Sequence, residues 1–123
     1  MATRIILVNQ GKRGAQAEQL AAAFLKLQGL QLIETNYRCR FGEIDLICRD
    51  GRDLVFVEVR LRGSEAFGGA AASITLRKQE KILLAARHYL QQLGSSPACR
   101  FDVVLLRGLR DNDIEWIRNA FGE

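Results

Sequence analysis

The sequence has little cysteine, histidine or proline. Three cysteines, one histidine and one proline occur among its 123 residues. No two cysteines have the CxxC spacing of a metal or redox site, and an odd number of cysteines argues against a framework of disulfides. We therefore expect Cys39, Cys48 and Cys99 to be reduced thiols, and we assign no role to the isolated His88.

The chain also lacks long hydrophobic runs. The opening apolar run, at residues 5–8, is far too short for a signal peptide or a membrane segment. No later run reaches the roughly 18 apolar residues of a membrane helix. No repeat, linker or low-complexity stretch divides the sequence. These absences predict a cytoplasmic protein that does not contact a membrane.

What the chain does contain is enough apolar side chains for a core and a small excess of positive charge. Of its residues, 48% are hydrophobic and 26% are charged, which suits one domain of this size. The formal net charge is +4. A mild basic excess favours an anionic partner such as nucleic acid, although many soluble proteins carry such an excess without binding one.

The hydrophobic pattern predicts helices and strands in alternation after a flexible lead-in at residues 1–13. Helical spacing of apolar side chains predicts helices at residues 15–28 and 73–93, the second capped by Ser73 or Thr75. Strands are predicted at residues 30–37, 42–48, 53–60, 100–106 and 114–117, with a tail at residues 119–123. Residues 14–123 would then form a single domain.

Two of these strands carry the acidic residues that point to chemistry. An Asp-Gly dipeptide within residues 49–52 predicts an antiparallel hairpin, because its turn favours positive φ at both central positions. We expect Cys48 to pair with Asp53. In that register Asp45 and Glu58 are diagonal neighbours on one face, roughly 7–8 Å apart at the backbone.

Arg60 follows Glu58 by two residues and shares its face. A sheet face directed at a core should not carry two acids and a base unless something offsets their desolvation. A divalent cation would do so, and carboxylates suit Mg²⁺, which takes waters and a substrate phosphate as its other ligands. The alternative is an ion pair of Asp45 or Glu58 with Arg60 on a half-exposed sheet. The spacing alone leaves both interpretations open.

In combination these motifs resemble those of the PD-(D/E)xK nuclease superfamily. The pattern is an acid on a leading helix, then Gly-Glu-Ile-Asp ending at Asp45, then Val-Phe-Val-Glu-Val-Arg ending at Arg60. More narrowly, the chain resembles the uncharacterised YraN-like proteins, small bacterial relatives of Holliday-junction resolvases. That likeness runs from about residue 14 to residue 121 and includes the motifs Phe67-Gly68-Gly69, Lys78-Gln79 and Arg100-Phe101-Asp102-Val103-Val104.

The resemblance implies an α/β fold with a restriction-endonuclease-like core, in which a mixed β-sheet with an antiparallel hairpin has two main helices packed against it. It also implies Asp45 and Glu58 as ligands of Mg²⁺ or Mn²⁺, Glu18 as the helical acid, and Arg60 at the superfamily's lysine position. This departure matters, because a guanidinium cannot be deprotonated in a protein and is a poor general base. Arg60 can still hold a phosphate or stabilise transition-state charge.

The other catalytic candidates lie on the two predicted helices. Glu18 flanks the apolar stripe of the first helix, where it is either an active-site acid or an acid favoured by the helix dipole. Lys78 and Gln79 begin the face of the second helix that packs on the sheet. Lys78 could stand near the paired acids and supply the titratable amine that the lysine position lacks. Alternatively, its stem covers the sheet edge.

Three further residues are candidates for contact with nucleic acid. Arg77 and Lys81 lie on another face of the second helix, which is either directed at phosphate or simply solvated. Phe67 lies in a glycine- and alanine-rich loop and either stacks on a base or anchors the loop. Asp102, within an apolar strand, is expected to be hydrogen-bonded structure rather than a catalytic residue.

The sequence thus predicts a nucleic-acid-binding protein with metal-dependent endonuclease activity, on DNA rather than RNA, with a structure-specific, resolvase-like preference as one option. Two alternatives stay open. One is a nucleic-acid-binding module of nuclease ancestry whose Lys-to-Arg change has weakened or removed cleavage, and the other is a protein-interaction adaptor. The intact acids favour the nuclease, and Arg60 favours the inactive module. Cleavage of a symmetric junction would require a homodimer.

Overall fold

The computed structural model describes residues 2–61, 74–109 and 113–122, with side chains from Gly14 onward. Its elements are α1 (Ala2–Leu27), β1 (Gln31–Cys39), β2 (Gly42–Asp50), β3 (Asp53–Leu61), α2 (Leu76–Leu93), β4 (Cys99–Leu106) and β5 (Ile114–Phe121). The strands form one sheet in the order β1-β2-β3-β4-β5, in which β3 and β4 are parallel and the other neighbours antiparallel. The predicted α/β fold with a mixed sheet is confirmed, and it is consistent with a restriction-endonuclease-like core.

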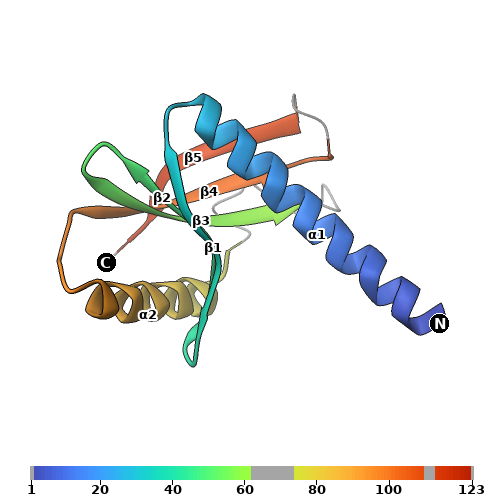
Figure 1. Cartoon of the computed structure of the whole chain (residues 1–123), viewed down its shortest axis with the longest axis horizontal. Helices are drawn as coiled ribbons and strands as arrows, with labels where there is room; N and C mark the ends of the chain where they lie inside the picture. The colour runs from blue at the N-terminus through green and yellow to red at the C-terminus, as the bar shows by residue number, and fades with distance from the viewer. Residues whose placement is uncertain (1, 62–73, 110–112, 123) are drawn as a thin grey trace.

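The two helices cover opposite faces of the sheet (Figure 1). Val55 and Val57 of β3 pack in the cluster under α1, whereas Leu54 and Phe56 pack in the cluster that contains Ile82 of α2. Successive side chains of a strand point to opposite faces. The continuous apolar sequence of β3 is therefore explained by helices on both sides of the sheet.

Helix α1 begins earlier than the sequence predicted. It starts at Ala2 rather than at residue 15, so the segment expected to be a lead-in is helical. Gly11 and Gly14 suggested a break, because each costs about 1 kcal/mol in a helix interior relative to alanine. Once the packed turns from Ala17 onward are formed, however, each added residue gains a hydrogen bond without a new nucleation cost. Helix α1 runs across the boundary predicted at residue 14, and the domain assignment itself stays a prediction.

The N-terminal part of α1 extends beyond the sheet (Figure 1). Its length of 26 residues does not make it a membrane span. Neither α1 nor any other helix in the described residues is long and apolar enough to cross a membrane.

The β2–β3 hairpin differs from the predicted one in its turn and its register. Asp50 pairs with Asp53, so the turn is Gly51 and Arg52 alone, and the predicted pairing of Cys48 with Asp53 is wrong. Of the two turn residues only Gly51 has a positive φ, 62°, which is the pattern of a type II′ turn with glycine first. The register moves by two residues relative to the prediction. Because side chains alternate with a period of two, a register shift of two residues does not by itself move a side chain to the other face.

Helix α2 begins at Leu76 rather than at residue 73. Thr75 is its N-cap and accepts a hydrogen bond from the Lys78 backbone N–H at 3.1 Å, which confirms one of the two predicted caps. Gly94, with φ of 77°, ends the helix. The other predicted cap, Ser73, lies outside the described residues.

Strand β4 is buried, as predicted, and β5 is longer than predicted. The segment expected to be a tail continues the strand to Phe121. The register of β4 and β5 shifts between Phe101 and Val103, near Asn119 with its φ of 52°. The Asn119 backbone N–H donates to the buried Asp102 carboxylate at 2.9 Å. This contact holds the last part of β5 on the sheet, which a pattern of apolar residues could not reveal.

Candidate active site

Asp45 and Glu58 meet where β2 and β3 separate. The ladder between these strands ends at the pair Leu46 and Val57, and the next residue on each strand is one of the two acids. Asp45 Oδ2 accepts a hydrogen bond from the Val59 backbone N–H at 2.8 Å. The two carboxyl groups lie within hydrogen-bonding reach of each other. The prediction that both acids share one face and approach each other is confirmed.

Two cationic side chains approach Glu58 from different elements. Arg60 Nη1, from β3, lies 3.7 Å from Glu58 Oε2, and Lys78 Nζ, from the first turn of α2, lies 3.9 Å from the same oxygen. Both distances exceed those of normal hydrogen bonds. The arginine and lysine side chains are 40% and 33% exposed, whereas the Glu58 side chain is only 5% exposed. The structure thus places Lys78 near the acids, with both cations between the buried carboxylate and solvent.

Burial raises the pKa of both acids. The pKa of Glu58 is raised to about 7, first by burial and then by the negative charge of Asp45, while Lys78 and Arg60 lower it. Burial also raises the pKa of Asp45, and the hydrogen bond from Val59 opposes this shift. Two carboxyl groups this close favour a state in which they share a proton. Near neutral pH the pair therefore carries less than two negative charges unless another cation joins it.

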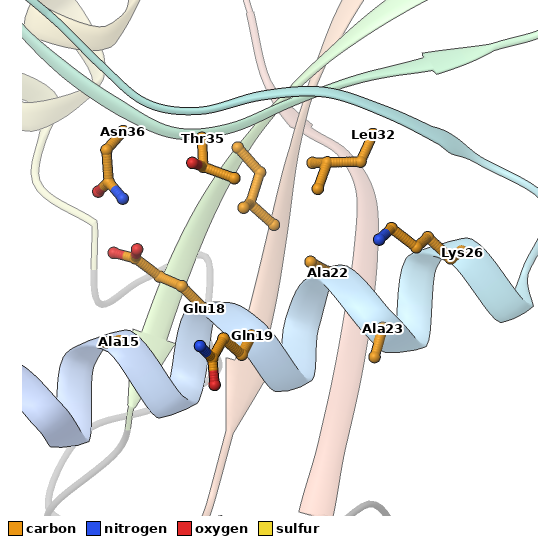
Figure 2. A pocket seen from close by; sticks show the side chains of 10 residues that line it. Ala15, Glu18, Gln19, Ala22, Ala23, Lys26, Leu32, Thr35 and Asn36 are labelled. Carbon is orange, nitrogen blue, oxygen red and sulfur yellow. The ribbon is translucent and has the colours of Figure 1, made fainter.

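Glu18 approaches the site from α1 but does not join the pair. It lines a cleft of about 370 Å³ between α1 and β1, together with Lys26, Leu32, Thr35, Asn36 and other residues. Its carboxylate points toward Asn36 (Figure 2). Burial and then the charge of Asp45 raise the pKa of Glu18, and a hydrogen bond with Asn36 lowers it. The charge of Asp45 therefore acts on Glu18, whose hydrogen-bond partner is the Asn36 side-chain amide.

The described residues contain no group of three or more His, Cys, Asp or Glu side chains that could hold a metal ion. Any ion at this site would rest on the Asp45 and Glu58 carboxylates and on oxygens from outside the chain. That donor set fits Mg²⁺ or Mn²⁺, because Mg²⁺ takes one or two carboxylates from a protein and completes its shell with waters and substrate phosphate.

Gln79 fixes the segment that enters α2. Its side-chain Nε2 donates to the Ile74 carbonyl at 3.0 Å, and its backbone N–H donates to the Thr75 carbonyl at 3.0 Å. Ile74 is buried, 4% exposed. These bonds hold the start of α2, and with it Lys78. A catalytic role for Gln79 stays a prediction.

The candidates for nucleic-acid contact have different outcomes. Arg77 and Lys81 are exposed on α2, so both can meet a partner. Phe67 and its loop lie outside the described residues. Two residues that the sequence analysis overlooked, Arg40 and Phe41, form the turn between β1 and β2 next to Lys81. An aromatic residue directly after an arginine, before a glycine at the link of two strands, was the signal that could have identified them.

Asp102 is structural, as predicted. It is fully buried and accepts hydrogen bonds from Arg100 Nε at 3.1 Å, Trp116 Nε1 at 3.0 Å and the Asn119 backbone N–H at 2.9 Å. Arg100 also donates to Asp50 at 2.9 Å. These contacts join β4 to β5 and to the β2–β3 hairpin.

Comparisons with known proteins place the chain in a family. The family described as "Uncharacterised protein family UPF0102" matches residues 17–106. A UPF0102 protein of Nitrosomonas europaea is 61% identical over 113 residues, which cover 92% of this chain and 96% of the relative. UPF0102 proteins of Nitrosospira multiformis and Aeromonas hydrophila are 62% and 54% identical over 109 and 112 residues, each covering 89% of this chain and 92% and 84% of the relative. The chain therefore belongs to the UPF0102 family, the YraN-like proteins that its motifs resemble.

Proposed function

We propose that this protein binds nucleic acid and hydrolyses phosphodiester bonds with the help of Mg²⁺ or Mn²⁺, acting on DNA rather than RNA. One observation carries the proposal. Two acids, Asp45 and Glu58, meet at the point where β2 and β3 part, and two cations stand over them toward solvent. This arrangement suits a metal ion held by the two acids and a phosphate held by the two cations on the solvent side.

The raised pKa values of the acids support the metal as a partner. The pair keeps its full negative charge at neutral pH only at a cost, because burial and mutual repulsion oppose it. Asp45 and Glu58 would hold the ion, which would activate a water and neutralise charge on the phosphate. The hydrogen bond from Val59 to Asp45 Oδ2 keeps that carboxylate oriented without a bound ion.

Arg60 and Lys78 would hold the phosphate. Their ion pairs with Glu58 are long, 3.7 and 3.9 Å, and both side chains reach toward solvent. Arg60 offers a planar fork that binds phosphate oxygens but cannot take up a proton at neutral pH. Lys78 supplies the amine that the β3 position lacks, so it could serve where the superfamily uses its strand lysine. Glu18, on the α1 side, is close enough to Asp45 for the charge of Asp45 to raise its pKa, after burial.

A second candidate function is binding without cleavage, and Arg60 is the observation that favours it. If a lysine at this position of β3 is needed for proton transfer, the arginine leaves a site that holds phosphate and metal without cutting. The two candidates share their binding groups and differ only in turnover. A protein-interaction adaptor explains neither the paired acids nor the cations above them.

Cleavage of branched and linear DNA in Mg²⁺ or Mn²⁺ tests the proposal. We expect Asp45→Asn and Glu58→Gln each to abolish cleavage while keeping most phosphate-driven affinity, because the two effects depend on different groups. Asp53→Asn is the matched control, since Asp53 is an exposed acid at the other end of β3. Lys78→Ala should lower cleavage strongly, and Arg60→Lys should raise it only if the arginine limits the reaction.

Two outcomes would change the conclusion. DNA binding without metal-dependent cleavage, in the wild type and in Arg60→Lys, would establish the inactive module instead. Cleavage that survives in the double variant of Asp45→Asn and Glu58→Gln would show that the acids are not the metal site.

A further inference from the structure

The turn between β1 and β2 carries an aromatic ring that is not part of the core. The pairing of the strands ends at Cys39 and Gly42, so Arg40 and Phe41 form the turn. Phe41 is partly exposed and belongs to none of the hydrophobic clusters of the described residues. The Arg40 guanidinium lies over its ring, with Cζ 4.8 Å from the ring centroid. An aromatic ring with a cation on one face has the character of a stacking platform.

Helix α2 supports this turn from the side. The Phe41 ring lies 6.1 Å from the His88 ring, with the two planes at 65°. His88 is in turn hydrogen-bonded to the hydroxyl of the buried Tyr37. Lys81 packs against the turn so closely that a Cβ at Gly42 would lie 3.4 Å from the Lys81 Cβ. The turn thus contacts α2 and extends beside one end of this helix (Figure 1).

The surface around the turn is basic. We call it the turn surface, and it consists of Arg38, Arg40, Phe41, Arg77, Lys81 and His88. Four of these residues are exposed cations. Arg77 and Lys81 are one helical turn apart and so lie on the same side of α2. The acidic neighbour Glu43 forms an ion pair with Arg38 at 3.3 Å. Exposed positive charge next to an aromatic ring is complementary to the phosphates and bases of nucleic acid.

The turn surface is continuous with the proposed cleavage site. Gly42 and Asp45 are three residues apart on β2, which is about 10 Å of strand. On α2, Arg77 of the turn surface directly precedes Lys78, which lies over Glu58. One strand of nucleic acid rises about 3.4 Å per nucleotide. A strand held at the acids therefore reaches Phe41 about three nucleotides away.

We propose that the turn surface binds the nucleotides next to the scissile phosphate and that Phe41 stacks on an unpaired base there. This inference rests on the proposed function, because it takes Asp45 and Glu58 as the place of cleavage. The bases of a continuous duplex stack on each other, so they offer no free face to Phe41. The protein therefore prefers substrates with unpaired nucleotides near the cut, such as a flap or a branch, over continuous duplex.

The test compares a flap substrate with a continuous duplex of the same sequence, in EDTA so that metal-dependent cleavage does not occur. Fluorescence anisotropy gives affinity, and 2-aminopurine in the unpaired segment reports stacking through its quenching. Loss of a base–aromatic stack corresponds to about a tenfold to hundredfold loss of affinity. We expect Phe41→Ala to weaken flap binding by about tenfold, to abolish the quenching and to leave duplex binding unchanged. Phe41→Trp should keep both.

Charge variants and controls complete the design. Arg40→Ala and Lys81→Ala should weaken binding of both substrates and reduce the salt dependence, because each removes a phosphate contact. Arg52→Ala is the matched control, since Arg52 is an exposed cation in the two-residue turn between β2 and β3, at the opposite end of β2. This variant should bind the flap and the duplex with the affinity of the wild type. Phe41→Leu keeps apolar bulk but no aromatic face, so loss of quenching in this variant separates stacking from any effect on folding.

The outcomes separate this inference from the proposed function. Equal affinity of the wild type for flap and duplex, or full flap affinity and quenching in Phe41→Ala, would overturn the inference. Cleavage of the same substrates in Mg²⁺ is followed in parallel. Undiminished flap-selective cleavage by Phe41→Ala would likewise overturn the inference while leaving the nuclease function in place. Phe41-dependent flap binding without any cleavage would support it as a binding surface and overturn the nuclease function alone.

Discussion

Two buried carboxylate sites lie on the sheet, and they differ in how their charge is satisfied. Asp102 is fully buried and accepts hydrogen bonds of 2.9–3.1 Å from Arg100, Trp116 and Asn119. Glu58 is also buried, but its two cations stand at 3.7 and 3.9 Å, and a second carboxyl group lies within hydrogen-bonding reach. The first site has donors for its charge, whereas the second has a surplus of acceptors.

This difference distinguishes a carboxylate that holds the fold from a pair that can take a ligand. Donors from Arg100, Trp116 and Asn119 compensate the desolvation of Asp102, so removal of the carboxylate leaves these N–H groups without their acceptor. At Asp45 and Glu58 the charged state is disfavoured by burial and by repulsion between the acids. A proton or a cation therefore stabilises the site. Opposite effects of mutation on stability at the two sites are the expected signature.

The largest effect on stability is expected at Asp102, the carboxylate that has hydrogen-bond donors for its charge. Asp102→Ala should lower the free energy of unfolding by about 3–5 kcal/mol, because it removes the fully buried acceptor of the Arg100, Trp116 and Asn119 donors. Urea denaturation at pH 7 measures this loss. Asp53→Ala, at an exposed acid, should change stability by no more than about 0.5 kcal/mol. If Asp102→Ala lost as little unfolding free energy as Asp53→Ala, the two carboxylate sites would not differ in the way described.

The next effect has the opposite sign and depends on pH. Since the pKa of Glu58 is raised from 4.5 to about 7, folding favours its protonated form. This group therefore contributes stability that is fully present below about pH 4.5 and is lost as pH rises through about 7. The loss amounts to roughly 3 kcal/mol. Glu58→Gln removes this titration, so it should be more stable than the wild type at pH 8 in EDTA.

The measurement is urea denaturation of the wild type and Glu58→Gln at pH 5 and pH 8. The advantage of the variant should be small at pH 5 and large at pH 8, and saturating Mn²⁺ should reduce it by stabilising the wild type. Equal differences at both pH values would mean that Glu58 does not titrate in this range. The account of the site as a surplus of acceptors would then be wrong.

The smallest effect concerns Lys78. Its charge lowers the pKa of Glu58, so Lys78→Met should move the pH midpoint of the stability loss upward. A partly exposed ion pair contributes up to about 1 kcal/mol, which corresponds to about 0.7 pH unit at most. Lys81→Met, one turn along α2 and exposed, should leave the midpoint in place. A midpoint that does not move would show that the charge of Lys78 does not act on Glu58.

The sequence was sufficient to predict that the two acids share a face, because that inference changes only if the register is shifted by an odd number of residues. The predicted register was wrong by two residues, yet Asp45 and Glu58 still fall on one face. The hydrophobic pattern likewise predicted the mixed sheet, because strands buried on both faces have a recognisable composition. A register error of one residue would have separated the acids.

The details of the two sites could not be predicted because they depend on contacts distant in sequence. The separation of β2 from β3 beyond Leu46 and Val57 lets the Val59 N–H bond to Asp45. The continuation of β5 past residue 117 accompanies the bond from Asn119 to a buried carboxylate on β4. Apolar periodicity reports which side chains are buried, and it carries no information on where a ladder opens or which polar groups meet there.

The most direct test of the central claim is isothermal titration calorimetry of Mn²⁺ binding at pH 8. The account predicts one binding site in the wild type, weakened at least about tenfold by Asp45→Asn and by Glu58→Gln, since each removes a charged ligand. Binding should be unchanged in Asp53→Asn and should weaken as the pH falls below about 7, where Glu58 takes up a proton. Absence of Mn²⁺ binding by the wild type, or undiminished binding by the double variant of the two acids, would contradict it.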